Sequence, residues 1–183
     1  MGGQDKGLIE LDDKPMITYI IERLTPQVGS LLINANRNLD RYAQLGECRV
    51  VEDTIADFAG PLAGMATAME AARCEFILTV PCDSPLLADD FAERMYRTLT
   101  QSQTKLCVAH DGERLQPVFA LIATQLLASL LDFLRAGERK IDAWYAQHDY
   151  AVCYLSDRPE TFLNINTPEQ RDQIETRVRT PSC

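Results

Sequence analysis

The stretch E-F-I-L-T-V-P-C-D-S-P at positions 75–85 decides which fold this sequence predicts. Positions 75–80 form a short, strongly apolar run of the kind that makes a buried strand, and Pro81 ends it because proline cannot donate to a strand ladder. Asp83 follows three positions after the end of the strand, between Pro81 and Pro85. The sequence therefore predicts a buried strand that ends in a carboxylate held in place by two prolines.

Strands and helices are expected to alternate on both sides of this stretch. Apolar residues at Ile17, Ile20, Ile21 and Leu24 follow the spacing of one helix face, and Pro15 suits the first turn of that helix. Further strands are expected at 30–35, 49–51, 106–110, 117–120 and 151–155, and further helices at 60–72, 88–99, 126–134 and from 167 onward. This alternation predicts an α/β fold with a mostly parallel sheet covered on both faces, built as one domain over residues 1–183.

The composition narrows the classes of partner. The chain carries 18 Lys and Arg against 27 Asp and Glu, a net charge of −9, and contains no basic run. Such a surface repels phosphate backbones and anionic headgroups, so nucleic acid and membrane surfaces are not expected partners. A small phosphorylated ligand held by one or two local cations fits this charge balance.

The cysteines and histidines bear on metal binding and on location. Six cysteines are dispersed without a C-x-x-C pair, and there are only two histidines, so a zinc cage has little support. Dispersed cysteines are typical of reduced thiols, and no apolar stretch reaches the roughly 20 residues of a membrane span. We therefore expect a cytoplasmic protein.

Polar residues follow several of the expected strands. In open α/β sheets ligands bind beyond the carboxyl ends of the strands, so polar side chains at those ends are candidates for a site. The residues in this position are Asn34 and Asn36 after 30–35, Asp53 after 49–51, Asp83 after 75–80, and Asn164 and Asn166 in the loop before the last helix. Each signal is weak alone, but several such ends along one crevice favour a ligand site there.

Asp83 is the sharpest of these candidates. Mg²⁺ takes hard oxygen ligands and is commonly bound by one or two carboxylates together with substrate phosphates, which a strand-end aspartate fits. Asp-Ser-Pro is equally good turn chemistry, so the local pattern does not separate a metal ligand from an aspartate that caps the following helix. Cys82 beside it fits a buried structural thiol better than a nucleophile, because no histidine is near it in sequence.

Two further segments could contact phosphate or a base. Lys6 follows a glycine-rich start, where its charge suits a triphosphate, although a solvent-facing lysine is the alternative. The run G-P-L-A-G at 60–64 places small residues at a helix start, where free backbone N–H groups can meet an anion or a base edge. A plain loop-to-helix junction with proline in the first turn explains that run equally well.

Together these residues resemble the molybdenum cofactor guanylyltransferases, the MobA family, over nearly the whole chain. The motifs that carry the resemblance are M-G-G-Q-D-K-G at 1–7, N-A-N at 34–36, E-D at 52–53, G-P-L-A-G-M at 60–65, P-C-D-S-P at 81–85, H-D-G-E-R at 110–114, Q-P-V at 116–118, A-G-E-R-K at 136–140 and N-I-N-T-P-E at 164–169. In this order and spacing the set is far more specific than any one member. The resemblance implies a three-layer Rossmann-like nucleotidyltransferase fold and the transfer of GMP from GTP to molybdenum-molybdopterin, with release of pyrophosphate.

The resemblance also implies roles for individual residues. It makes Lys6 and Asp83 the catalytic pair, with Asp83 binding both GTP and Mg²⁺. The other GTP contacts that it implies are Asn34, Asp53 and a guanine-binding loop that includes Leu62 and Gly64, and it matches Asn164 and Asn166 to a pterin-side motif. Transient contact with other molybdenum-cofactor proteins is a further expectation.

The sequence departs from the family at its start. The family opens with an apolar strand and the loop L-A-G-G-x-S-x-R-M-G-G, of which this chain has only the final M-G-G. We expect the first strand and the start of the loop to be missing, either because the true protein is roughly 15–20 residues longer or because the chain is damaged. The intact downstream motifs favour the longer protein. Two other functions stay open: a nucleotidyltransferase of the same fold that uses CTP or a sugar phosphate, and a non-catalytic relative.

Overall fold

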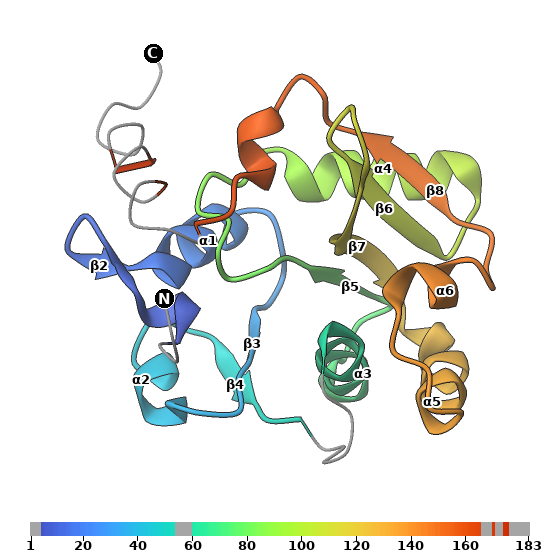
Figure 1. Ribbon diagram of the computed structural model, residues 1–183, viewed down its shortest axis with the longest axis horizontal. Helices are drawn as coiled ribbons and strands as arrows, with labels where there is room; N and C mark the ends of the chain where they lie inside the picture. The colour runs from blue at the N-terminus through green and yellow to red at the C-terminus, as the bar shows by residue number, and fades with distance from the viewer. Residues whose placement is uncertain (1–4, 54–59, 166–169, 171–173, 176–183) are drawn as a thin grey trace.

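The expected alternation of strands and helices is present in the computed structural model (Figure 1), which describes residues 5–53, 60–165, 170 and 174–175. The strands are β1 (Glu10–Leu11), β2 (Lys14–Pro15), β3 (Leu32–Asn34), β4 (Arg49–Val51), β5 (Phe76–Thr79), β6 (Leu106–His110), β7 (Leu115–Ala123) and β8 (Ala151–Tyr154). The α-helices are α1 (Met16–Leu24), α2 (Leu39–Ala43), α3 (Pro61–Ala71), α4 (Phe91–Ser102), α5 (Leu127–Arg135) and α6 (Ile141–Tyr145). Short 3₁₀ segments span Lys6–Leu8, Thr124–Leu126 and Pro159–Phe162.

The described strands pair in three sets. β1 and β2 form a small antiparallel hairpin, and β3 pairs in parallel with β4. The largest set has the order β5-β7-β6-β8, in which β7 is antiparallel to both of its neighbours and β8 is parallel to β6. The α/β class is confirmed: β5, β6 and β8 run in one direction, and β7 is the one strand of this set that runs against them.

The antiparallel strand has a local cause. β6 and β7 are joined by a tight turn in which Gly112 has a φ of +108° and the Asp111 N–H bonds to the Arg114 carbonyl at 3.2 Å. Parallel neighbours need a crossover of a dozen or more residues, so a connection this short forces β7 to run back along β6. The short connection between β6 and β7 therefore accounts for the one opposed strand of this set.

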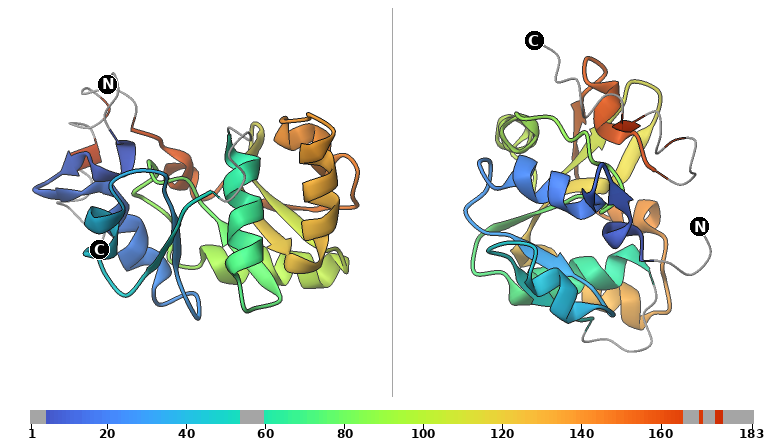
Figure 2. Two further views of the ribbon diagram at one scale, coloured as in Figure 1. Left: turned by 90° about the horizontal axis from the view of Figure 1, so that it is seen from below. Right: turned by 90° about the vertical axis from the view of Figure 1, so that its left-hand side faces the viewer.

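Helices cover both faces of the four-stranded sheet, which gives three layers (Figures 1 and 2). Along β6 the side chains alternate: Cys107 and Ala109 pack with α4 and part of α1, whereas Leu106 and Val108 pack with α3, α5 and α6. All four of these side chains are 0% exposed. Figure 2 shows α3 and α5 side by side on their face of the sheet. A strand buried on both faces sits at the centre of the core, as in other layered α/β domains.

Most elements fall where the sequence placed them. The strands expected at 75–80 and 106–110 are observed as β5 and β6, whereas the strand expected at 117–120 is the longer β7. The short helices α2 and α6 and the β1–β2 hairpin were not expected. The helix expected from residue 167 begins outside the described residues. Across the described part of the chain, no helix combines the length and apolarity needed to cross a membrane.

Candidate active site

Asp83 lies just beyond the carboxyl end of β5, so the apolar strand positions it at the edge of the sheet. Its residue is only 7% exposed, and its Oδ2 accepts a hydrogen bond from Lys6 Nζ at 3.2 Å. The Asp83 carbonyl accepts the N–H of Ile165 at 3.0 Å, which ties the strand end to the loop before the last helix. Two residues that the sequence proposed as a catalytic pair, 77 positions apart, are therefore brought into contact.

The segment that carries Lys6 is fixed by its neighbour Asp5. Asp5 accepts a 2.6 Å hydrogen bond from the Tyr42 hydroxyl and a 3.0 Å bond from Asn38 Nδ2, and Arg37 Nε lies 3.4 Å from its Oδ2. Burial and the hydrogen bond to Asp5 raise the pKa of Tyr42 well above its usual value, so the hydroxyl remains a donor. These contacts hold the 3₁₀ turn, and with it the backbone of Lys6, against α2.

Gly7 allows this close packing. A Cβ added at Gly7 would lie 2.7 Å from the Tyr42 hydroxyl oxygen, which is closer than real side chains come. A larger residue at this position would push the turn away from α2. Gly7, which directly follows Lys6, is therefore needed for packing at the site, in addition to any role in a flexible loop.

A second polar cluster lies at the carboxyl ends of β3 and β4. Asp53 Oδ1 accepts a bond from Asn34 Nδ2 at 2.9 Å, and its Oδ2 accepts one from Asn36 Nδ2 at 2.8 Å. The Asp53 N–H donates in return to Asn36 Oδ1 at 2.9 Å, and the Thr67 hydroxyl lies 3.4 Å from Asp53 Oδ1. The carboxylate thus orients two amide side chains while keeping lone pairs for a ligand.

The amino-terminal turn of α3 packs directly on this cluster. A Cβ at Gly64 would come within 2.6 Å of Asn34 Oδ1, so only glycine permits this approach. Leu62 is 1% exposed and its side chain belongs to the core, so any ligand contact at this position would come from its backbone. Its N–H lies in the first helical turn, where helix geometry provides no intrahelical acceptor.

The loop before the last helix forms a third part of the site. The Ser84 hydroxyl, itself 1% exposed, donates to Asn164 Oδ1 at 2.6 Å, and Asn164 is exposed. Because Ser84 directly follows Asp83 in the chain, this bond holds Asn164 close to Asp83. Asn166, the other residue expected on this side, lies outside the described residues.

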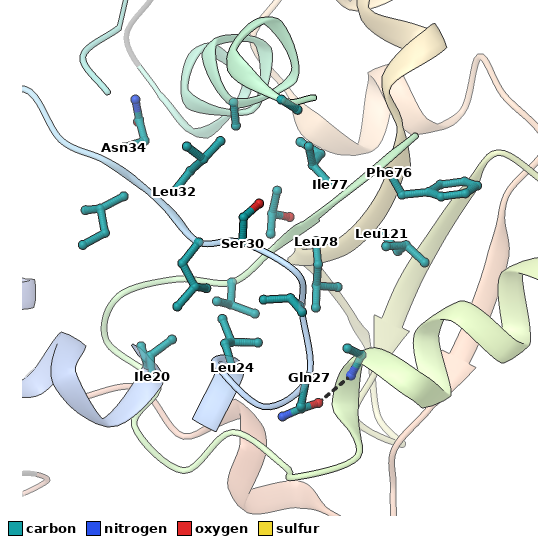
Figure 3. A pocket seen from close by; sticks show the side chains of 18 of the residues that line it. Ile20, Leu24, Gln27, Ser30, Leu32, Asn34, Phe76, Ile77, Leu78 and Leu121 are labelled. Atoms are coloured by element: carbon teal, nitrogen blue, oxygen red, sulfur yellow. Dashed lines mark hydrogen bonds between the residues drawn. The ribbon is translucent and has the colours of Figure 1, made fainter. Parts of the chain in front are cut away.

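Lys6, Asp83, Asn34 and Gly64 converge on one region. A pocket of about 1400 Å³ is bordered by Asn34, Gly64 and Asp83, so the second cluster and the Asp83 carboxylate open onto the same space. Figure 3 shows Asn34 at the rim of this pocket, close to α3. Three of the candidate residues, from the ends of β3 and β5 and from the start of α3, therefore border one crevice.

Cys82 does not have the properties of a nucleophile. Burial raises the pKa of its thiol to about 11, and the charges of Asp83 and Asp5 add to the shift. A thiol with so high a pKa is protonated at neutral pH, when the reactive form would be the thiolate. The burial of Cys82 and the nearby carboxylates therefore support its interpretation as a structural residue.

A magnesium ion would need ligands from its substrate as well as from the protein. Among the described residues, no three His, Cys, Asp or Glu side chains gather closely enough to hold a metal. Asp83 offers a hard carboxylate, and no donor from the described residues reaches its Oδ1. One nearly buried carboxylate beside a cation fits Mg²⁺ bound together with phosphates, which is how this ion is commonly held.

Sequence reasoning missed the residues that support the site. Asp5 is the neighbour of Lys6 and bonds to Tyr42, Thr67 bonds to Asp53, and Ser84 bonds to Asn164. The signal for Asp5 was its place beside Lys6 after a glycine-rich start. Tyr42 gave no local signal, because its contact with Asp5 spans 37 positions and depends on the fold.

Comparisons with known proteins agree with this geometry. The model of the MobA-like NTP transferase domain matches residues 1–152. The chain is 52% identical to the molybdenum cofactor guanylyltransferase of Shewanella halifaxensis over 174 residues, which covers 95% of this chain and 86% of that protein. It is 50% identical to the protein of the same name from Shewanella loihica over 178 residues, covering 97% and 90%.

A solved structure shows the same fold. The molybdopterin-guanine dinucleotide biosynthesis protein A from Archaeoglobus fulgidus superposes with a TM-score of 0.81 at 17% identity, covering 97% of this chain and 92% of that one. The fold, with its polar site at the strand ends, defines a nucleotidyltransferase. Given the relatives at about half identity, the chain belongs to the MobA-like NTP transferase family, among the molybdenum cofactor guanylyltransferases.

Proposed function

We propose that this protein transfers GMP from GTP to molybdenum-molybdopterin and releases pyrophosphate. The observation that carries the proposal is the crevice bordered by both Asp83 and Asn34, since Asp83 is paired with Lys6 and Asn34 with Asp53. The lysine and carboxylate of the first pair suit a triphosphate, and the carboxylate and amide side chains of the second cluster suit a nucleobase. The names of the relatives at about half identity point to the same reaction.

The Asn34–Asp53 cluster is the proposed base subsite. Guanine presents two adjacent N–H donors and a carbonyl acceptor on its pairing edge, and the cluster offers a carboxylate, amide oxygens and the backbone N–H of Leu62 in the first turn of α3. Gly64 brings this N-terminal turn of α3 against Asn34, so the base would be enclosed by backbone on one side. Cytosine has one exocyclic donor and matches this pattern less completely.

The Lys6–Asp83 pair is the proposed phosphate subsite. When bound, Mg²⁺ on Asp83 would neutralise phosphate charge, as it does in other phosphoryl-transfer sites. Lys6 is half exposed, with its side chain 47% accessible, and can turn from Asp83 toward a departing pyrophosphate. The reaction needs in-line attack by the acceptor phosphate on the α-phosphorus, which demands positioning and charge stabilisation but no covalent enzyme intermediate.

The acceptor subsite is the least defined part of the proposal. Asn164, held by Ser84 next to Asp83, lies where a second substrate could meet the α-phosphate. Asn164 and Asn166 are proposed to contact the pterin side. Their amides can both donate and accept hydrogen bonds, which suits a pterin ring edge.

The test is Mg²⁺-dependent pyrophosphate release from GTP with molybdenum-molybdopterin as acceptor, with CTP in a parallel reaction. We expect turnover with GTP and at least a hundredfold less with CTP. Equal turnover with CTP would overturn the guanylyl assignment and favour a different nucleotidyltransferase. Tight GTP binding without pyrophosphate release under any of these conditions would instead support a non-catalytic relative.

A further inference from the structure

One short segment of the chain, residues 34–38, contacts both parts of the proposed GTP site. Its first half, at the carboxyl end of β3, bonds to the base subsite: Asn34 Nδ2 lies 2.9 Å from Asp53 Oδ1, and Asn36 Nδ2 lies 2.8 Å from Asp53 Oδ2. The Asp53 N–H donates back to Asn36 Oδ1 at 2.9 Å. These reciprocal bonds hold the first half of the segment against the residues that follow β4.

The second half of the segment contacts the residue that precedes Lys6. Asn38 Nδ2 donates to Asp5 Oδ2 at 3.0 Å, and Arg37 Nε lies 3.4 Å from the same oxygen. The Tyr42 hydroxyl donates to Asp5 Oδ1, so three donors converge on a carboxylate whose side chain is 15% exposed. Because Arg37 offsets the charge of Asp5, the ammonium of Lys6 is left to the proposed phosphate subsite.

The backbone of the segment is fixed at its second end. Asn38 is left-handed, with a φ of +55°, a conformation that asparagine adopts more readily than most residues. Its carbonyl accepts the N–H groups of Arg41 and Tyr42 at 3.0 and 3.1 Å, in the short helix α2, which lies beside β4 (Figure 1). Only one residue separates Asn36 from Arg37–Asn38 at most, so a shift at one end of the segment moves the other.

The contacts made by this segment lie close to solvent. Asn34, Asn36, Arg37 and Asn38 are all exposed, whereas Asp53 is half-buried. Hydrogen bonds that water can reach open locally at little cost in free energy, so the segment samples open arrangements when no ligand is bound. A base that binds to Asn34 and Asp53 favours the closed arrangement, because only there are both groups aligned for it.

The phosphate subsite cannot tell one base from another. Every nucleoside triphosphate carries the same three phosphates, so Lys6 and Asp83 attract all of them alike. A link between the base contacts and Lys6 would make the strength of phosphate binding depend on the base. Residues 34–38 provide such a link, since they are bonded to Asp53 at one end and to Asp5 at the other.

We propose that Arg37 and Asn38 are positioning residues that couple a base bound at Asn34 and Asp53 to the placement of Lys6 in the phosphate subsite. This inference rests on the proposed function. The base and the triphosphate then bind cooperatively, and by thermodynamic linkage each strengthens the binding of the other by the same factor. A nucleotide with the wrong base leaves the segment open and loses part of its phosphate affinity as well.

The first experiment uses guanosine, which carries the base but no phosphate. Lys6 is acetylated with acetic anhydride, with and without saturating guanosine, and its labelling is followed by mass spectrometry with the exposed Lys105 as internal reference. The Lys6 side chain is 47% exposed, so the reagent reaches it. We expect guanosine to slow the labelling of Lys6 about threefold or more, because the closed segment holds Lys6 against Asp83.

Asn38→Gly separates this coupling from direct shielding of Lys6 by guanosine. Glycine accepts the left-handed backbone and removes only the amide side chain. Gln103→Gly is the matched control, because Gln103 is exposed, has a φ of +54° and lies at the end of α4, outside the pocket. Guanosine should slow the labelling of Lys6 in Gln103→Gly as in the wild type, and should leave it unchanged in Asn38→Gly. Equal slowing in Asn38→Gly would overturn the coupling, as would an unchanged rate in a wild type that binds guanosine.

Titration calorimetry gives a second measurement, with a variant that leaves the backbone of α2 untouched. Arg37→Gln removes the guanidinium beside Asp5 and, like Asn38→Gly, should weaken GTP binding about tenfold while guanosine binding changes less than about twofold. An equal loss of affinity for both ligands would indicate general damage to the site and would overturn the positioning role. If the wild type binds no guanosine, the proposed base subsite is wrong and the coupling falls with it, whereas guanosine binding without any effect on Lys6 refutes the coupling alone.

Discussion

At the scale of single residues, Asp83 is nearly buried, yet its side chain belongs to none of the apolar clusters of the described residues. Asp83→Asn keeps its shape but removes the charge that faces Lys6. We expect GTP turnover to fall about a hundredfold or more, as when other preorganised charges are removed from active sites, with the far-ultraviolet circular dichroism unchanged. Glu22→Gln is the matched control, because Glu22 pairs with Lys14 at 2.7 Å on the surface away from the crevice. Wild-type turnover in Asp83→Asn would contradict the phosphate and metal roles.

Tyr42 is not among the proposed substrate contacts, but it bonds to Asp5, the neighbour of Lys6. Tyr42→Phe deletes the 2.6 Å hydrogen bond to Asp5 and loosens the turn that carries Lys6. The expected results are a several-fold rise in KM for GTP, a smaller change in kcat and a loss of about 1–3 kcal/mol in the free energy of unfolding. Saturation kinetics and urea unfolding measure these effects. Tyr150→Phe serves as control, since its hydroxyl has no hydrogen-bond partner in the described part of the chain; equal effects in both variants would argue against a positioning role.

At the scale of elements, local patterns predicted the structure where the cause was local. β5 followed from an apolar run ended by Pro81, and α5 followed from leucines spaced along one face. The β1–β2 hairpin could not be predicted, because its turn uses left-handed backbone at Asp12 and Asp13, with φ of +49° and +64°, where glycine would be the usual signal. The direction of β7 was not predicted for a different reason: it depends on the short connection from β6, and the alternation of strands and helices does not reveal it.

The contact between α3 and β3 depends on one glycine. Gly64→Ala would place a Cβ 2.6 Å from Asn34 Oδ1 and push the helix start away from the base subsite. We expect a loss of about 1–3 kcal/mol in stability and at least tenfold weaker GTP binding by titration calorimetry. Gly29→Ala is the control, because nothing lies within 4 Å of its added Cβ. Normal GTP binding in Gly64→Ala would show that this approach is not needed for the base.

The ion pair that joins α4 to the loop after β8 should weaken as the pH falls. Arg94 donates to both Asp157 oxygens at 2.8 Å, and these hydrogen bonds lower the pKa of Asp157 to about 2. A carboxyl whose pKa is lower in the folded state contributes stability above its unfolded value of about 3.9, and this contribution is lost as pH falls toward 2. The difference in melting temperature between wild type and Asp157→Asn should therefore be constant from pH 7 to 5 and shrink between pH 4 and 2. A difference that persists unchanged at pH 2 would contradict the ion pair.

At the scale of the whole molecule, strand ends predict which candidate residues gather, but not which residues support them. Asn34, Asp53 and Asp83 could be grouped because each follows a strand, and strands of an α/β sheet end at a common edge. The support from Asp5 and the close approach of Gly64 arise only when distant segments fold together, so no local pattern contains them.

The split between the two sheets predicts unequal stability within one molecule. Cys48 packs in the cluster beside β3 and β4, whereas Cys107 is 0% exposed at the centre of the four-stranded sheet, and burial raises the pKa of its thiol to about 12. No backbone hydrogen bonds join β3 to β5, so the first region should open without unfolding the second. In pulsed thiol labelling read by mass spectrometry, Cys48 should react at least tenfold faster than Cys107 at low denaturant. Equal rates would mean that α1 and α3 join the two regions into one cooperative unit.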